Sequence, residues 1–271
     1  MITLLSLNLW YGKCFDQLMK YIREGSMDID IFCFQEMLST TSSPLWLDDG
    51  QRLNLFSEIS NVLPEFTGIF APARDWYDIR NLEMPYHFSG GLALFARKSI
   101  HVVCSGDIFV IGERSRYDNY DTKRNMSAPR NLQYIVTRDQ NGQETMIANF
   151  HGIWNGQGKT DTPARICQSQ NITNFFDQVR TSSDQKIRKI LCGDFNLRPD
   201  TESLRILEED TGMINLIKTC LIPTTRSSYY DKREQEPYAD YMLISPDVHA
   251  SYFMVDRTEV SDHLPLILQY K

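Results

Sequence analysis

The chain alternates short apolar runs with stretches in which apolar residues recur at helical spacing. The apolar runs, rich in β-branched residues, predict strands at residues 2–7, 29–34, 66–70, 91–96, 132–137, 145–150, 187–192, 238–244, 250–255 and 264–269. The helical spacing predicts helices at about residues 15–23, 51–62 and 163–179, and a short helix after Pro199. Together these elements predict an α+β protein.

Two parts of the pattern, near the start and in the middle of the chain, have the order strand, helix, strand. Runs that are apolar on both faces are typical of buried parallel strands, and ligands gather at the carboxyl ends of such strands. Asn8 and Glu36 follow the two strands of the first unit, and His151 and Asp194 follow those of the second. We therefore expect these side chains at one edge of the fold.

The late strands begin, rather than end, with polar residues. Asp240 opens one of them, and Asp262 and His263 directly precede the last. Antiparallel placement would bring these residues to the edge that holds the others. Asp240 could instead be only a cap at the start of its strand. A site shared between both ends of the chain predicts one domain over residues 1–271.

The segment at residues 187–199 concentrates this chemistry. Gly193 closes an apolar strand, after which alternation would put Asp194 and Asn196 on one side and Phe195 on the other, as an anchor. A carboxylate there can hold a divalent cation or take a proton from water, and an amide can donate to a phosphate oxygen. A capped turn before a helix is the structural alternative.

The candidate ligands are all oxygen donors, namely Glu36, Asp194, Asp240 and Asp262, with Asn8 and Asn196. No cluster of cysteine and histidine in the sequence accompanies them, which argues against zinc. Hard oxygen ligands fit Mg²⁺, with Mn²⁺ as the alternative. Without a cation, converging carboxylates would raise one another's pKa.

Two stretches rich in aromatic and charged residues interrupt the strand pattern and predict long loops. Residues 72–90 include Trp76, whose ring could stack on a base or a lipid head group, or could only pack the loop down. Residues 113–130 include Tyr117 and Arg130 among several basic side chains. They are the best candidates for phosphate contacts, although their acidic residues fit a solvated loop equally well.

The helix at residues 163–179 follows Asp161 and Thr162, either of which can cap it. Arg165 and Gln168 are three residues apart on this helix. They could reach back into the site, with Arg165 as a substrate contact, or could belong to a solvated face.

The composition limits the class of protein. A chain of 271 residues with a formal net charge of -7 does not favour nonspecific coating of nucleic acid, although a local basic groove could offset the charge. The six cysteines are scattered and predict no disulfide framework. The sequence lacks a secretory segment and an apolar run long enough for a membrane span, so we expect a cytoplasmic protein. Nothing implies a protein partner.

Six short motifs carry a resemblance to a known family. In chain order they are Leu7-Asn8-Leu9-Trp10, Gln35-Glu36, Asn149-Phe150-His151, Gly193-Asp194-Phe195-Asn196, Asp240-Tyr241 and Ser261-Asp262-His263. Each is weakly specific alone, whereas six in order over nearly the whole chain are strongly specific. The chain thus resembles the endonuclease/exonuclease/phosphatase family, which has the deoxyribonuclease fold. The resemblance implies a four-layer α/β/β/α sandwich, with two mixed β-sheets packed face to face, helices outside, and the site where the halves meet.

The resemblance also implies roles. Glu36 would be the main ligand of a catalytic Mg²⁺, Asn8 would support it, and Asp240 would bind metal or orient the site. Asp194 would orient and deprotonate the attacking water, while Asn196 would hold a phosphate oxygen.

Three further residues would handle charge. Asp262 would accept a hydrogen bond from the His263 ring, fix it and favour its protonated form. His263 and His151 would then stabilise the negative charge of the transition state.

We therefore expect a Mg²⁺-dependent hydrolase that cleaves a phosphodiester by in-line attack of water, with a nuclease-like phosphodiesterase favoured and nucleic acid as a candidate partner. Members of the resembled family also act on phosphomonoesters, lipids and inositol phosphates, so these substrates stay open. The acidic chain favours a single-stranded or small substrate. A catalytically silent member that only binds metal and phosphate is the alternative from another class.

Overall fold

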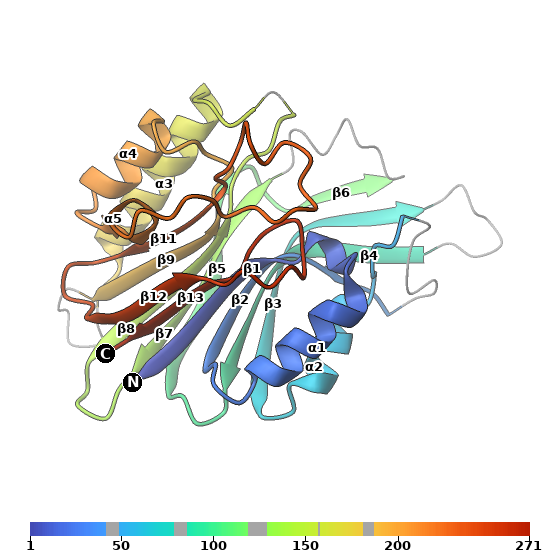
Figure 1. The fold of residues 1–271 in the computed structure, drawn as a ribbon, viewed down its shortest axis with the longest axis horizontal. Helices are drawn as coiled ribbons and strands as arrows, with labels where there is room; N and C mark the ends of the chain where they lie inside the picture. Colours follow the sequence, from blue (N-terminus) through green and yellow to red (C-terminus); the bar gives the residue numbers. More distant parts are fainter. Residues whose placement is uncertain (42–48, 79–85, 119–128, 157, 181–186) are drawn as a thin grey trace.

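Two mixed β-sheets pack face to face, with helices on their outer faces (Figure 1). The computed structural model describes residues 1–41, 49–78, 86–118, 129–156, 158–180 and 187–271. The first sheet has the order β12 (Ala250–Val255), β13 (Leu266–Tyr270), β1 (Ile2–Asn8), β2 (Ile31–Ser39), β4 (Tyr86–Arg97), β3 (Phe66–Asp78), β6 (Ser115–Asp118). The second has the order β10 (Ile214–Asn215), β11 (Asp240–Ile244), β9 (Arg188–Asp194), β8 (Glu144–His151), β7 (Arg130–Arg138), β5 (Val102–Ile111). The expected sandwich is confirmed.

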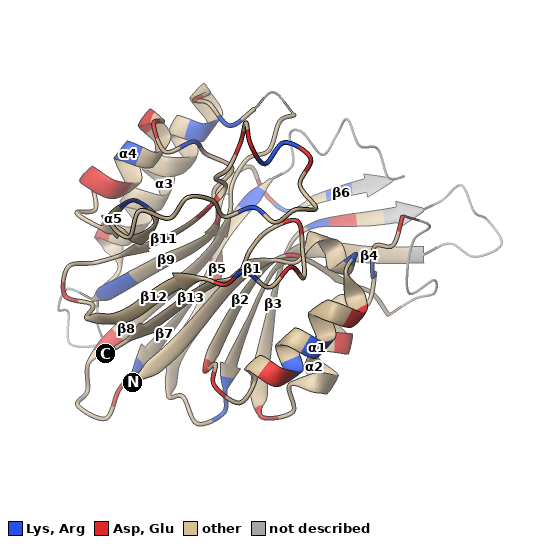
Figure 2. Ribbon diagram, in the orientation of Figure 1, with Lys and Arg blue, Asp and Glu red and all other residues tan. Residues whose placement is uncertain are grey.

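The outer layers are helical. The 3-10 turn η1 (Trp10–Gly12), α1 (Phe15–Gly25) and α2 (Leu55–Val62) belong to the first sheet's side. The helices α3 (Pro163–Gln178), α4 (Glu202–Glu209) and α5 (Leu216–Thr219) cover the second. Lys, Arg, Asp and Glu residues lie mostly on the helices and loops, while the central strands carry few (Figure 2). In the part of the chain that the structure describes, no helix is long and apolar enough to cross a membrane.

The strands are apolar because both of their faces are covered. In β2, Phe32 and Phe34 pack toward α1 and α2, while Ile31 and Cys33 belong to the core between the sheets. Residues that alternate between two dry environments must all be apolar, which explains why continuous apolar runs located the strands.

Both predicted β-α-β units are present. β1 and β2 run parallel with Asn8 opposite Gln35, and β8 and β9 run parallel with His151 opposite Asp194. β11 runs antiparallel to β9 and places Asp240 opposite Asp194. The carboxyl ends of these four strands and the amino end of β11 therefore carry the predicted site residues.

Residues 72–90, predicted as a loop, largely form the ends of two long strands. β3 and β4 are paired from Phe66 to Asp78 on the β3 side, with a register shift next to Pro72. The shift accommodates the proline, and Gly91 allows the backbones to meet, because a Cβ there would lie 2.1 Å from the Ala71 carbonyl oxygen. Proline and glycine thus mark a bulge here, and the loop prediction was wrong for residues 72–78 and 86–90.

The second predicted loop is partly strand as well. β6 pairs parallel with β3, with Tyr117 opposite Trp76, and Arg130 begins β7. Residues 79–85 and 119–128, which belong to the two predicted loops, lie outside the described residues.

The two candidate caps of α3 have different partners. The Thr162 side chain accepts a hydrogen bond from the Arg165 backbone N–H and so caps α3. The Asp161 carboxylate accepts hydrogen bonds from the backbone N–H groups of Glu202 (2.8 Å) and Ser203 (2.9 Å) at the start of α4. Thr162 is therefore the cap of α3, and Asp161 joins α3 to α4.

A buried amide cluster crosses between the sheets. Asn149 of β8 donates from Nδ2 to the carbonyl oxygens of Phe34 (3.0 Å) and Ala93 (3.2 Å) in the first sheet. Its Oδ1 accepts from Gln35 Nε2 at 2.7 Å, and Gln133 Oε1 lies 3.3 Å from its Nδ2. Asn149 and Gln35 are fully buried. Because most of these bonds join one sheet to the other, the cluster fixes their relative position.

Asn149→Leu should lower the free energy of unfolding by about 3 kcal/mol, because the Phe34 and Ala93 carbonyls and the Gln35 amide lose a buried partner. Urea unfolding followed by circular dichroism measures the change. Asn174→Leu, the same substitution at an exposed position of α3, should stay within about 0.5 kcal/mol of the parent. Equal stability of the two variants would show that apolar packing alone positions the sheets.

Candidate active site

Asn8 joins the two halves of the site. It ends β1 and is fully buried. Its Nδ2 donates to Asp194 Oδ2 at 3.0 Å, and its Oδ1 accepts from the Trp10 backbone N–H at 3.0 Å. Since Asn8 belongs to the first sheet and Asp194 to the second, the strand ends of both sheets meet at this bond.

Glu36 stands in a bulge of β2. The register between β2 and β4 shifts between Phe34 and Met37, and Glu36 has a φ of 56°. A bulge re-aims its extra residue, and a left-handed φ at a residue with a side chain costs on the order of 1 kcal/mol. The bulge leaves Glu36 Oε1 4.0 Å from Nε2 of His151 in the other sheet. The sequence predicted a strand that ends at residue 34, whereas β2 continues to Ser39, so the bulge at Glu36 was not predicted.

Carboxylates crowd around Glu36. Burial, together with the charges of Asp262 and Asp194, raises the pKa of Glu36 to about 8. A hydrogen bond from Asn8 and the charge of Arg74 oppose the rise in this pKa. A bound cation would offset the repulsion among these carboxylates.

The turn after β9 holds Asp194 and Asn196. Gly193 has a φ of 137°, and a Cβ there would lie 1.9 Å from the Phe150 carbonyl oxygen, so only glycine fits. Phe195 anchors the turn, as predicted, by packing on Phe150 and Tyr241 with ring centroids 5.5 and 5.3 Å away.

Asn196 departs from the expected strand alternation. Its φ is 52°, and its backbone N–H donates to Asp194 Oδ1 at 3.0 Å. Its Nδ2 donates to the Gly152 carbonyl oxygen at 3.4 Å. The bond from the Asn196 backbone N–H therefore caps the turn, as the structural alternative expected, and also fixes the Asp194 carboxylate in the site.

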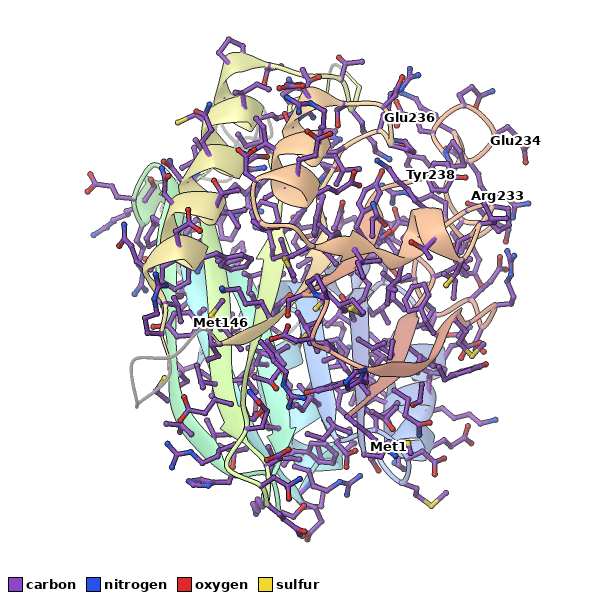
Figure 3. All side chains as sticks on the ribbon, turned by 90° about the vertical axis from the view of Figure 1, so that its left-hand side faces the viewer. Met1, Met146, Arg233, Glu234, Glu236 and Tyr238 are labelled. Carbon is purple, nitrogen blue, oxygen red and sulfur yellow. The ribbon has the colours of Figure 1, made fainter. Side chains whose placement is uncertain are left out.

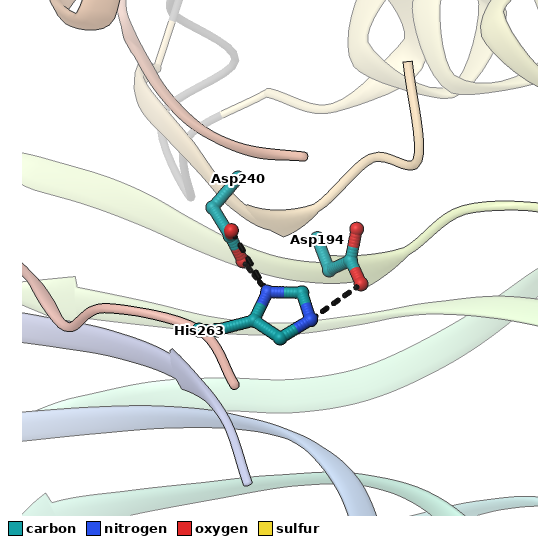
Figure 4. Close-up of side chains that lie close together, drawn as sticks. All are labelled: Asp194, Asp240 and His263. Atoms are coloured by element: carbon teal, nitrogen blue, oxygen red, sulfur yellow. Dashed lines mark hydrogen bonds and ion pairs between the residues drawn. The ribbon is translucent and has the colours of Figure 1, made fainter. Parts of the chain in front are cut away.

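His263 lies between two aspartates (Figure 4). Its Nδ1 is 2.8 Å and 2.9 Å from the two carboxylate oxygens of Asp240, and its Nε2 is 3.6 Å from Asp194 Oδ2. Asp262 Oδ1 is 3.8 Å from Nε2, too far for a hydrogen bond. The prediction that Asp262 holds this ring was therefore wrong. Asp240, which pairs with Asp194 across β11 and β9, holds it.

Burial and the charge of Arg226 lower the pKa of His263 to about 4, which opposes the protonated form expected from the sequence. With Nδ1–H donated to Asp240, Nε2 is the acceptor, and Arg226 Nη1 lies against it. The pKa of Asp240 is itself raised to about 7 by burial.

Arg226 and Lys159 are site residues that the sequence gave no motif to find. Arg226 is buried, with Nη1 3.4 Å from Asp262 Oδ2 and its guanidinium 4.1 Å from the Tyr230 ring centroid. Lys159 is buried, and its Nζ donates to the Tyr238 carbonyl oxygen at 3.0 Å. Burial lowers the pKa of Lys159 to about 8. Isolated basic residues in irregular segments have no periodic signal, so only their surroundings identify them.

Arg130, predicted to contact substrate, lies in the site. With Tyr11, Glu36, Arg74 and His151 it lines a small cavity of about 20 Å³. Its Nε is buried and has no hydrogen-bond partner among the described residues. Burial and the nearby Arg74 lower the pKa of Arg130 to about 10.

Trp76 is not available for stacking on a ligand. It is buried in β3, with its ring stacked on Phe88 at 4.8 Å between centroids and the Arg74 guanidinium 4.7 Å from its centroid. The alternative that it packs its own segment is the correct one. The side chain of Tyr117 lies outside the described structure.

Arg165 holds a loop instead of contacting substrate. It is fully buried, and its guanidinium donates to the carbonyl oxygens of Ile153, Gly158 and Thr160. Gln168 Oε1 accepts from the Ile153 backbone N–H at 3.0 Å. Both the substrate role and the solvated face were wrong, because buried carbonyls of an irregular loop need donors that strands do not supply.

Two sets of side chains have ligand chemistry for a divalent cation. One is the oxygen-only set of Glu36 with Asp262 and Asp194, whose charges raise the pKa of Glu36, and Asn8, which bonds Asp194. The other is Asp194, Asp240 and His263, whose ligand atoms lie within 4.8 Å of one another. Oxygen ligands suit a hard ion such as Mg²⁺, whereas in the second set His263 Nδ1 is bonded to Asp240.

Comparisons with known proteins agree with this geometry. A profile described as the Endonuclease/Exonuclease/phosphatase family matches residues 5–263. No curated protein matches the chain. Among solved structures, the mannosyl-6-phosphatase Bt3783 of Bacteroides thetaiotaomicron VPI-5482 is similar at 17% identity and a TM-score of 0.69, with 100% of both chains covered. The human Nocturnin catalytic domain with bound sulfate is similar at 17% identity and a TM-score of 0.64, covering 100% of this chain and 93% of that one. These likenesses concern the fold.

Mg²⁺ should raise the thermal midpoint more at about pH 8.5 than at about pH 6. The folded pKa of Glu36, about 8, lies above its ordinary value, so the neutral group stabilises the metal-free protein at low pH. That contribution is lost as the pH rises toward 8, and a cation then meets a carboxylate without a proton to displace. Differential scanning fluorimetry with Mg²⁺ or EDTA measures the increments, and Glu36→Gln should lose them. Equal increments at both pH values would place the cation elsewhere.

Proposed function

Because the chain belongs to the Endonuclease/Exonuclease/phosphatase family and is a hydrolase of phosphoester bonds, we propose that it removes a terminal phosphate from a small organic molecule with a divalent cation. The observation that carries this proposal is the unequal space on the two sides of the catalytic residues. The cavity at Arg130 measures about 20 Å³, and the pocket at Asp262 about 320 Å³.

The space decides between one and two ester substituents. About 10–15 Å³ of such volume holds one water, so the cavity at Arg130 takes little more than an oxygen atom or two. The pocket at Asp262 is large enough for an organic group. A diester would need room on both sides, whereas a monoester places its oxygens toward Arg130 and its single substituent toward Asp262. The geometry therefore supports a monoester over the nuclease-like diester that the sequence favoured.

Asp194 is best placed to take a proton from water. It is 2% exposed, and its two oxygens accept hydrogen bonds from Asn8 Nδ2 and the Asn196 backbone N–H, both at 3.0 Å. A carboxylate held in this way can orient a water and accept its proton during attack on phosphorus.

Donors for the phosphate oxygens come from both sides. The Nε atoms of Arg130 and Arg226 are buried and have no partner among the described residues. An unpaired buried donor is costly, so both atoms suit an anion that completes their hydrogen bonding. Burial and the charge of Arg130 hold the pKa of His151 well below its ordinary value, so this ring is neutral and can also donate. Asn196 Nδ2 donates to the Gly152 carbonyl oxygen, and its second N–H would be a further donor to the phosphate.

Glu36 and Asp262, with Asn8 beside them, would hold the cation. Their oxygens suit Mg²⁺, with Mn²⁺ as the alternative, and the raised pKa of Glu36 reflects burial and the crowding that such an ion relieves. When bound, the cation would neutralise charge on the phosphate oxygens. In this proposal Asp262 is a metal ligand, and Asp240 has the second of the two roles implied by the resemblance, because it orients His263.

The similar proteins support this proposal in part. One is a mannosyl-6-phosphatase, and another binds a sulfate anion. The negative charge of the chain also argues against a long polyanionic substrate. The predicted cytoplasmic location stays a prediction.

With Mg²⁺, p-nitrophenyl phosphate should be hydrolysed at least about tenfold faster than bis-p-nitrophenyl phosphate, because only one substituent has room. EDTA should abolish both rates, which a p-nitrophenol assay follows. Asp194→Asn should lower kcat by about 10³-fold, and the exposed Asp200→Asn should not change it. A faster diester would restore the phosphodiesterase expected from the sequence.

The exchanged roles of two aspartates can be separated by titrating activity with Mg²⁺. Asp262→Asn should raise the concentration for half-maximal activity by about tenfold or more, because it removes a ligand. Asp240→Asn should lower kcat at saturating Mg²⁺ by about 10²-fold, because His263 loses its anchor. The opposite pattern would support the sequence-based assignment.

A further inference from the structure

We propose that the pocket beside Asp262 binds the ring of a sugar whose phosphate is removed, an inference that rests on the proposed monoesterase function. The pocket measures about 320 Å³ and is lined by Trp10, Trp154, Lys159, Tyr229, Tyr230 and Asp262 among others. Asp262 belongs both to this wall and to the group around Glu36, so a molecule in the pocket can present its phosphate to the catalytic residues. Glu236 and Tyr238, on the segment that forms the wall, lie at the end of the molecule opposite Met1 (Figure 3).

Aromatic faces are exposed in this pocket. Trp154 is 47% exposed and has no ring partner among the residues that the structure describes, and Tyr229 is 42% exposed. Trp10 stacks on Tyr229 with 6.4 Å between centroids. Large aromatic side chains in contact with water around one pocket mark a binding site. The apolar C–H face of a sugar ring is suited to pack on such a surface.

The polar lining separates a sugar from a nucleobase. Asp231, Lys232 and Glu236 line the pocket together with Lys159. A hydroxyl both donates and accepts, so each hydroxyl of a sugar can pair with a carboxylate or an ammonium group. A base carries its donors and acceptors only in the plane of its ring, whereas sugar hydroxyls project around the ring and can meet charged groups on several walls. Mixed charges around a single exposed indole therefore favour a polyhydroxylated ring.

The pocket is held in shape without a ligand. Tyr230 contacts two cations, with the Arg226 guanidinium 4.1 Å and Lys159 Nζ 5.0 Å from its ring centroid. Its hydroxyl donates to Glu236 Oε2 at 2.6 Å. The buried guanidinium of Arg165 fixes the loop that carries Trp154 and Lys159. Because these walls are fixed in advance, little ordering is needed on binding.

The test compares kcat/KM, from release of inorganic phosphate, for glucose 6-phosphate, adenosine 5′-monophosphate and glycerol 1-phosphate. The parent protein should prefer glucose 6-phosphate. Trp154→Ala should lower kcat/KM for this substrate about five- to tenfold, mainly through KM, and leave glycerol 1-phosphate unchanged. Tyr252→Ala, an equally exposed aromatic on β12 far from the pocket lining, should change neither. A preference for the nucleotide, or an equal effect of Trp154→Ala on all substrates, would overturn the sugar pocket.

A binding measurement keeps the two proposals apart. If none of the monoesters is hydrolysed, the monoesterase function is wrong, and calorimetric titration of glucose 6-phosphate with Ca²⁺ present then decides the pocket. Binding that Trp154→Ala weakens about five- to tenfold supports the sugar pocket. A Kd that this substitution leaves unchanged, or no binding at all, overturns it.

Discussion

The hydrogen bond between Gln35 and Asn149 crosses from one sheet to the other in a fully buried place. Asn149 also bonds two carbonyl groups of the opposite sheet, so a shift of the sheets would leave several buried polar groups unpaired. Gln35 immediately precedes Glu36, and Asn149 lies two residues before His151. Apolar packing would tolerate sliding more readily, whereas this cluster accepts one register and thereby sets which side chains of the two sheets meet.

The side chains that meet at that edge are crowded, buried charged groups, and each is unfavourable there without a partner of opposite charge. Burial and the carboxylates beside Glu36 raise its pKa to about 8, while burial and the nearby Arg74 lower the pKa of Arg130 to about 10. Such a site is costly in stability unless anions and cations arrive together. In the proposed function, a phosphate and a divalent cation would supply both. The cavity at Arg130 is small and the pocket at Asp262 is large, and this difference would then orient the substrate.

The sequence by itself determined the two-sheet fold and most of the site, although it gave no apolar run for the partly exposed edge strands β5 and β6. Strands covered on both faces are apolar throughout, so continuous apolar runs in the sequence located them. The polar residues at the ends of these runs marked one edge of the fold. Asn8, Glu36, His151, Asp194, Asn196, Asp240, Asp262, His263 and Arg130 all reach that edge. The six motifs that contain most of these residues indicated the family, because a site built from the whole chain leaves its motifs in a fixed order along the sequence.

Tertiary structure alone decided which of these residues are partners. Asp262 is adjacent to His263 in sequence, yet Asp240 holds the ring, because the pairing of β11 with β9 and not chain neighbourhood sets the contact. Trp76 and Arg165 are residue types that could contact a ligand, but the fold uses both for internal contacts. The Trp76 ring packs on Phe88, and the Arg165 guanidinium binds loop carbonyl oxygens. Arg226 and Lys159 gave no pattern, since a basic residue becomes part of a site only through what folds around it. The local sequence specifies where a strand ends. The packing of the two sheets sets the distances between strand ends, and therefore which side chains contact one another.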